Sequence, residues 1–183
     1  MKILAISGSA RSESANTAFL KGIKELAPSG VEFNIFHRLD ILPVFSPDSE
    51  GKKTPSEVIQ FLQLVATADG IIISSPEYIR SIPGGLKNAI DWMVSRFEII
   101  GKPIALAHAS HRGDGMLVSL RRVLSTVSDR FLENLFVRVP VIGKSQEEIL
   151  SLMRQPEQKT QVSSFLSQFL SEIHQKRKHE AVA

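Results

Sequence analysis

The sequence predicts a doubly wound α/β fold in which helices cover both faces of a parallel sheet. Its apolar runs are continuous, without the period-two alternation of half-exposed strands, and segments with helical periodicity lie between them. This alternation of strand and helix implies right-handed crossovers between neighbouring parallel strands. At 183 residues, the chain is expected to form one domain over residues 1–183.

Five strands are expected, each bounded by turn residues. Continuous apolar runs at 3–6, 70–74 and 103–107 are typical of strands buried on both faces, and weaker strands fit 31–36 and 135–139. Five strands favour a three-layer, flavodoxin-like sheet of order 2-1-3-4-5 over a six-stranded dinucleotide-binding fold.

Five helices are expected between and after the strands. In the first, at about 15–27, Phe19 and Ile23 fall on one face and Pro28 ends the helix. The remaining helices are expected at about 55–68, from Pro83 onward, at about 116–131 and at about 157–176. Residues 42–53, with two prolines and a glycine, indicate one long surface loop.

The positive charge is concentrated at the end of the chain. The net charge is +3, and the basic tail, residues 176–183, supplies +2 of it through Lys176, Arg177 and Lys178 against Glu180. The nearly neutral body argues against a nucleic-acid partner. No run approaches the ~20 apolar residues of a membrane span, and Ser7-Gly8-Ser9 interrupts the first apolar run too early for a secretory signal. We therefore expect a cytoplasmic protein without a membrane partner.

Metal and thiol chemistry are not expected. The chain has no cysteine, which removes disulfides, thiolate zinc sites and cysteine nucleophiles. His108 and His111 form the one close histidine pair, and Asp114 would have to be a third ligand. A pair that spans a strand end and its loop lacks the helical geometry that directs two rings at one ion, so no metal is assigned.

The loop after the first strand is a candidate phosphate site. In parallel sheets, ligands bind beyond the carboxyl ends of the strands, near the switch point between the first and third strands. Residues 7–17 there combine short hydroxyls, a glycine, Arg11 and a helix N-terminus, the donors that a phosphate dianion requires. In the alternative, Ser14 and Asn16 only cap the helix and Arg11 is a solvated surface charge.

The missing motifs narrow the ligand further. The loop contains neither G-x-x-x-x-G-K-[ST] nor G-x-G-x-x-G, and the third strand ends in Ser74-Ser75 without an aspartate for magnesium. Triphosphates and pyrophosphates are therefore disfavoured. A terminal phosphate monoester, held without metal, fits what remains.

The loop after the third strand is suited to a flat ring. Pro76 and Tyr78 offer an apolar edge, and the following backbone amides can donate to a heteroaromatic ring. Alternatively, Tyr78 and Ile79 simply cover the end of the sheet. Trp92, in the following helix, is interpreted as a core or interface residue.

These motifs together resemble the NADPH-dependent FMN reductase family. Gly8-Ser9-x-Arg11-x-x-Ser14-x-Asn16 follows the first strand and Leu42-Pro43-x-Phe45 the second. Pro76-Glu77-Tyr78, and then Pro83-Gly84-x-Leu86-Lys87-Asn88-Ala89-Ile90-Asp91-Trp92, follow the third. The resemblance covers roughly residues 1–140. It implies a flavodoxin-like fold and enzymes that reduce quinones, azo dyes or chromate.

The resemblance also implies residues that contact FMN. The phosphate would be held by Ser9, Arg11, Ser14, Asn16 and Thr17. The isoalloxazine ring would lie along Pro76, Glu77, Tyr78 and the backbone of Ile79, where the family commonly has asparagine. The Ser/Gly-rich turn of the family corresponds to Ser110, His111 and Gly113, and His111 and Arg112 are bulkier here than the small residues expected.

The implied reaction is hydride transfer from NADPH, or NADH, through bound FMN to a small acceptor: a quinone, an azo compound, a metal oxyanion or free flavin. No side-chain base is required, so no catalytic residue is assigned. The alternatives are a flavodoxin-like electron carrier, against which the pI of about 9.3 argues, or a flavin-binding sensor. The resemblance further implies a homodimer or homotetramer, with Trp92, Met93 and Phe97 as an apolar patch that fits an interface or the core.

Overall fold

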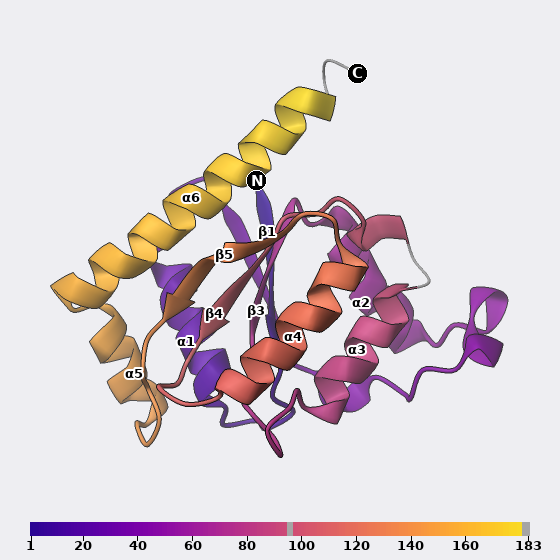
Figure 1. Ribbon diagram of the computed structural model, residues 1–183, viewed down its shortest axis with the longest axis horizontal. Coiled ribbons are helices and arrows are strands. Elements are labelled where there is room, and N and C mark those ends of the chain that lie inside the picture. Colours follow the sequence, from indigo (N-terminus) through magenta and orange to yellow (C-terminus); the bar gives the residue numbers. More distant parts are fainter. Residues whose placement is uncertain (95–96, 181–183) are drawn as a thin grey trace.

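The sheet has the predicted parallel architecture (Figure 1). The computed structural model describes residues 1–94 and 97–180. The strands run in the order β2-β1-β3-β4-β5, all parallel, which confirms the predicted fold class and order. They are β1 (Lys2–Ser7), β2 (Glu32–Phe36), β3 (Gly70–Ser74), β4 (Ile104–His108) and β5 (Phe131–Arg138).

Helices cover both faces of this sheet, and the sheet separates the core into two clusters (Figure 1). One face packs against α2 (Ser56–Thr67), α3 (Gly84–Val94) and α4 (Asp114–Val127). The other packs against α1 (Ala15–Glu25), α5 (Gln146–Met153) and α6 (Pro156–Glu180). Every residue of β3 and β4 is buried, which explains why their sequences are continuously apolar.

Two helix boundaries differ from the sequence prediction. The fourth helix was expected to run to 131 but ends at Val127, because Phe131, although apolar, already begins β5. The last helix continues to Glu180, so most of the predicted basic tail is helical and only residues 181–183 lie outside the described residues. No helix in the described part of the chain is both long enough and apolar enough to cross a membrane.

Helix α5 was not predicted at all. Ser145 and Glu148 form a capping box at its start, in which the Ser145 hydroxyl accepts from the Glu148 amide at 3.2 Å. Ile149 and Met153 are buried, and the Met153 side chain packs against Gly22 of α1, where a Cβ would lie 2.6 Å from it. The helix is only eight residues long, which leaves little periodicity to detect.

The loop after β2 is held against α3 by two side chains of the third-strand motif. The Asn88 amide donates to the carbonyls of Leu42 and Pro43 at 3.3 and 3.0 Å, and its oxygen accepts from the Phe45 amide at 2.8 Å. Trp92 Nε1 donates to the Pro43 carbonyl at 2.8 Å, and its ring meets Phe45 edge to face. Residues 42–45 are therefore fixed, while two short 3₁₀ helices, Pro47–Ser49 and Gly51–Lys53, interrupt the rest of the predicted loop.

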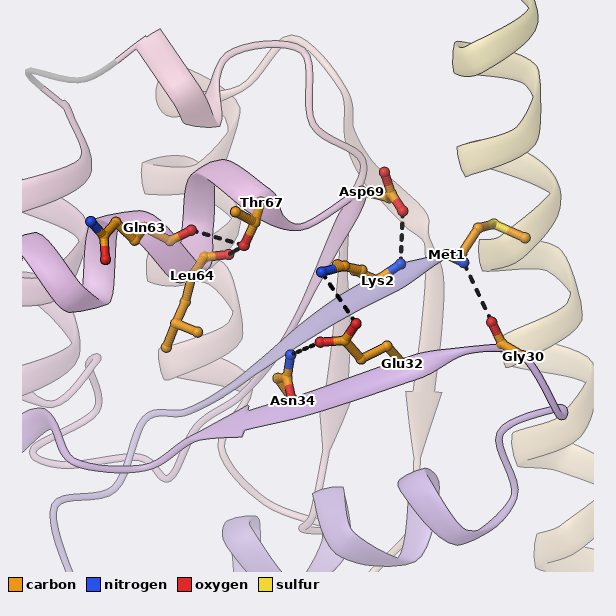
Figure 2. Close-up of polar contacts among 9 residues, drawn as sticks. All are labelled: Met1, Lys2, Gly30, Glu32, Asn34, Gln63, Leu64, Thr67 and Asp69. Carbon is orange, nitrogen blue, oxygen red and sulfur yellow. Dashed lines mark hydrogen bonds and ion pairs between the residues drawn. The ribbon is translucent and has the colours of Figure 1, made fainter.

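Polar contacts close the amino-terminal end of the sheet (Figure 2). The Lys2 ammonium pairs with the Glu32 carboxylate across β1 and β2 at 3.3 Å, and Glu32 also accepts from Asn34 at 2.8 Å. The Lys2 amide donates to Asp69 at 2.7 Å, just before β3. These contacts join β1 and β2 to the residue before β3 at the amino-terminal edge of the sheet.

Candidate functional site

A pocket of about 420 Å³ opens at the carboxyl ends of the strands, as the sequence predicts for a sheet of this order. It is formed mainly by the loops after β1, β3 and β4. The predicted site residues that line it are Ser9, Arg11, Ser14, Asn16, Pro76, Glu77, Tyr78, Ser110 and Gly113. The structure therefore brings together residues that are about a hundred positions apart in the chain.

The first loop presents a cation and two hydroxyls to the pocket. Ser14 is the N-cap of α1 and accepts from the Thr17 amide at 3.5 Å, and Ser9 accepts from the Arg11 amide at 3.3 Å. Since each hydroxyl accepts from the backbone, its own hydrogen is free to donate to a ligand. The Arg11 side chain is exposed and forms no ion pair with any described residue.

Two side-chain hydrogen bonds, one from Ser74 to Asn16 and one from Thr17 to Ser7, hold this loop and the start of α1 in place. The Ser74 hydroxyl at the end of β3 donates to Asn16 Oδ1 at 2.9 Å, which leaves the amide nitrogen of Asn16 as its free group. Thr17, predicted to contact the ligand, is not part of the pocket lining: it is buried and its hydroxyl donates to Ser7 at 2.8 Å. Thr17 thus fastens α1 to the end of β1.

Gly8 lets the first and second loops approach closely. Its amide donates to the Ser74 carbonyl at 2.7 Å, and a Cβ at this position would lie 2.6 Å from Ser75 Oγ and 2.9 Å from a Leu86 methyl. Any larger residue would separate the two loops. The glycine of the family motif is therefore explained by the contact between these loops.

The second loop forms a tight hairpin beyond the pocket. Tyr78 and Ser81 exchange two backbone hydrogen bonds of 3.0 Å, and the residues between them, Ile79 and Arg80, have φ of 50° and 56°. This is a two-residue turn with both central residues left-handed. Pro76 and Tyr78 line the pocket, whereas the Ile79 side chain is fully exposed and does not.

Glu77 joins the second loop to the third. Its Oε2 accepts a hydrogen bond of 2.9 Å from the Met116 amide in the first turn of α4. A carboxylate at a helix N-terminus is stabilised by the free amides and the helix dipole. Glu77 is the only acidic residue among the described residues of the pocket lining, and this bond fixes the position of its carboxylate.

The third loop is organised around His108, which the sequence analysis considered only as a metal ligand. The side chain is 1% exposed, and its Nε2 contacts the Arg112 carbonyl; because a carbonyl only accepts, Nε2 carries the hydrogen. Gly113, with φ of 99°, lies so close that a Cβ would be 2.9 Å from the His108 ring. Burial, together with the nearby Arg138 charge, lowers the pKa of His108 below its ordinary value of 6.5.

His111 lies outside the pocket lining and is exposed. Several lining residues were missed by the sequence analysis: Ala15, Ser75, His108, Ala109, Arg112, Ile142 and Gly143. His108 ends β4, so the rule that ligands bind at strand ends could have found it. Ile142 and Gly143 follow β5, and reading a fourth loop by the same rule would have included them.

Comparison with known proteins identifies the family of the chain. Residues 1–138 match the family described as NADPH-dependent FMN reductase, and the chain belongs to that family. The match includes β1 to β5, with the three loops that form most of the pocket, and ends before α5 and α6.

Individual relatives carry the same class of name. Over 114 residues the chain is 32% identical to a quinone reductase of Escherichia coli (strain K12), a match that covers 60% of each chain. It is 41% identical over 92 residues to a 2-hydroxy-1,4-benzoquinone reductase of Burkholderia sp, covering 50% of this chain and 49% of that one. The chain thus spans about 60% or less of the length of these relatives.

A solved structure supports the fold over nearly the whole chain. FerB, a flavoenzyme NAD(P)H:(acceptor) oxidoreductase from Paracoccus denitrificans, superposes with a TM-score of 0.70 at 22% identity, covering 96% of this chain and 98% of that one. The shared architecture is the flavodoxin-like sheet with its flanking helices.

Proposed function

We propose that this chain is an FMN-dependent NAD(P)H oxidoreductase that reduces a small acceptor such as a quinone, an azo compound, a metal oxyanion or free flavin. The observation that carries the proposal is the Arg11 guanidinium, which forms no ion pair with a described residue and lines a pocket shared with the N-terminus of α1, at the carboxyl ends of β1, β3 and β4. When bound, FMN supplies the redox chemistry, carrying a hydride from the nicotinamide to the acceptor.

The donor set of the first loop fits a phosphate monoester. Arg11 supplies a fixed charge, while the hydroxyls of Ser9 and Ser14 and the free Asn16 amide supply neutral donors. The first-turn amides of α1 add further donors without a metal. This combination matches the terminal phosphate of FMN in charge and in hydrogen-bonding capacity.

The remaining walls suit the ring. Pro76 and Tyr78 offer an apolar surface, and the buried His108 lines the pocket together with Ala109 and Ser110. The Met116 amide holds the Glu77 carboxylate, so Glu77 orients this wall of the pocket. The chain's part is to bind and orient the ring and to exclude water from it.

The names of the relatives support a quinone as acceptor, and the family description supports NADPH as the hydride donor. We further propose that the protein is cytoplasmic and forms a homodimer or homotetramer. Trp92 and Met93 belong to the core, so of the predicted apolar patch only Phe97 is exposed, together with Val94 and Ile100 nearby. Sedimentation of the purified protein measures its oligomeric state directly.

The decisive experiment compares FMN binding by the wild-type protein and Arg11→Ala. Losing one charge-assisted contact is expected to cost about 1.5–3 kcal/mol, roughly a ten- to hundredfold weaker Kd in a flavin fluorescence titration. Arg122→Ala, an exposed arginine of α4 outside the pocket, is the matched control. Wild-type affinity in Arg11→Ala would reject the phosphate assignment.

A second measurement separates the reductase from an electron carrier or a sensor. Anaerobic mixing of the FMN-loaded protein with NADPH should bleach the flavin absorbance, because the proposed enzyme accepts the hydride directly. Flavin that stays oxidised with both NADPH and NADH would favour the carrier or the sensor.

A further inference from the structure

The pocket contains a second cation that the proposed phosphate site does not use. Arg112 lines the pocket together with Arg11, and neither forms an ion pair with a described residue. Arg11 follows β1 and Arg112 follows β4, with β3 between these two strands. Strands two apart lie roughly 10 Å from each other, so the two arginines reach the pocket from separate loops.

The acidic groups near Arg112 are already engaged. Asp114, two residues on, accepts from Arg138 at 2.6 Å, and Arg138 lowers the pKa of that carboxyl. Glu77 is held by the Met116 amide. Among the described residues the pocket lining therefore carries two arginines against one carboxylate, Glu77, and no ion pair joins that carboxylate to Arg112.

The backbone of Arg112 is fixed on both sides. Its amide donates to Ser110 Oγ at 2.9 Å, and its carbonyl accepts from the buried His108 ring. His108 in turn stacks near Phe136 of β5, with ring centroids 6.4 Å apart, and packs against Gly113. A side chain that starts from such a rigid backbone loses less entropy when it binds a ligand than one on a mobile loop.

We infer that Arg112 is a specificity-determining residue that binds an anionic oxygen group, phosphate or sulfonate, on the second ligand that enters the pocket over bound FMN. His108 is its positioning residue. The inference rests on the proposed function, because it needs the flavin phosphate at Arg11. The anionic group belongs either to the nicotinamide dinucleotide or to the acceptor, and the two sources share this chemistry.

The test measures the binding of three unreactive ligands to the FMN-loaded, oxidised protein by calorimetry. NADP⁺ is the donor probe, 1,4-naphthoquinone-2-sulfonate is the anionic acceptor probe, and 1,4-naphthoquinone is its neutral counterpart. Arg112→Gln should weaken at least one anionic ligand tenfold or more while the neutral quinone stays within about twofold, a difference that should shrink as salt is raised. Arg112→Lys should recover part of the loss, and Arg122→Gln should show none.

The pattern of loss identifies the source of the anion. A loss confined to NADP⁺ assigns Arg112 to the hydride donor, and one confined to the sulfonated quinone assigns it to the acceptor. Both anionic ligands binding Arg112→Gln within twofold of wild type would overturn the inference. An equal loss of affinity for the neutral quinone would also overturn it, because Arg112 would then only shape the pocket. So would a tenfold loss of FMN affinity, because Arg112 would then bind the flavin.

A second pair of variants tests the positioning role of His108. His108→Leu removes the donor to the Arg112 carbonyl and should reproduce the loss of anion affinity, while His108→Gln retains an N–H and should restore it to within about threefold. His37→Leu, an exposed histidine beyond β2, is the control. A leucine variant that binds the anions normally would remove His108 from the inference. If the wild-type protein does not bind FMN, both the proposed function and the role of Arg112 are overturned. If it binds FMN normally and Arg112→Gln keeps wild-type affinity for both anionic ligands, only the role of Arg112 is overturned.

Discussion

Ile79 occupies a backbone conformation that its branched side chain disfavours. With Arg80 it forms the turn between Tyr78 and Ser81, and both residues have positive φ. Such turns favour asparagine and glycine, and a left-handed conformation costs an ordinary residue roughly 1–2 kcal/mol. Since the Ile79 side chain is 100% exposed, no packing within the chain offsets this cost.

Ile79→Asn is therefore expected to stabilise the protein by about 1 kcal/mol. The urea midpoint of unfolding should rise while the slope with denaturant stays the same. Val44→Asn is the matched control, because Val44 is also strongly exposed but has no positive φ and should gain nothing. An unchanged or lower midpoint for Ile79→Asn would contradict the strain argument.

The sequence predicted polar residues that line the pocket better than the residues that hold the pocket loops in place. Ser9 and Arg11 were identified because a hydroxyl and a cation near a helix N-terminus have a recognisable chemistry. The role of His108 depends on contacts with Arg112 and Gly113 that exist only after folding. A histidine at the end of an apolar strand carries no signal that separates these contacts from ordinary burial.

At the scale of elements, the hydrogen bonds from Asn88 and Trp92 to residues 42–45 form a clamp between α3 and the loop after β2. This clamp gives a structural reason for these residues of the family motif. Asn88 uses its whole amide on Leu42, Pro43 and Phe45, and Trp92 adds a fourth hydrogen bond. The motif residues on α3 thus recognise the motif residues of the loop, and neither group lines the pocket.

Asn88→Ala leaves the partly buried Phe45 amide and Leu42 carbonyl without a partner, whereas the Pro43 carbonyl keeps its bond from Trp92. Unfolding free energy is expected to fall by about 1–3 kcal/mol, with faster protease cleavage within residues 42–55. Asn34→Ala, which removes only an exposed contact with Glu32, should cost less than about 0.5 kcal/mol. If urea unfolding shows equal losses of unfolding free energy in the two variants, the Asn88 hydrogen bonds stabilise the fold no more than an exposed contact does.

Four of the five strands were predicted more reliably than the helix ends, whereas the fifth was expected at 135–139 but spans Phe131–Arg138. The 70–74 prediction matches β3 because every residue there is buried and the run is bounded by turns. The 116–131 helix was predicted too long, since the apolar Phe131 continues the pattern although it pairs with Ile104 in the sheet. Whether an apolar residue such as Phe131 ends a helix or begins a strand depends on its pairing in the sheet, and the periodicity of the sequence does not show that pairing.

For the whole molecule, α6 completes the second half of the core. It lies across the sheet (Figure 1), and its Phe169 and Ile173 side chains pack so closely on Gly70 that a Cβ there would be 2.7 Å from Ile173. The helix follows the last residue that matches the family. The packing of β3, the strand that precedes the second pocket loop, thus depends on a segment beyond the match.

Phe169→Ala should cost about 3–5 kcal/mol of unfolding free energy, since Phe169 is fully buried and the rigid sheet cannot collapse into the cavity. Leu170→Ala, the adjacent and only partly buried position, should cost clearly less. Thermal or urea unfolding of the two variants measures the difference. A loss below about 1 kcal/mol for Phe169→Ala would mean that α6 is only loosely packed on the sheet.

The hydrogen bond between Glu77 and the Met116 amide also couples the loop after β3 to the first turn of α4. Separating the two segments breaks a charge-assisted bond of roughly 1.5–3 kcal/mol. We therefore expect them to move together, so that a displacement of one is passed on to the other.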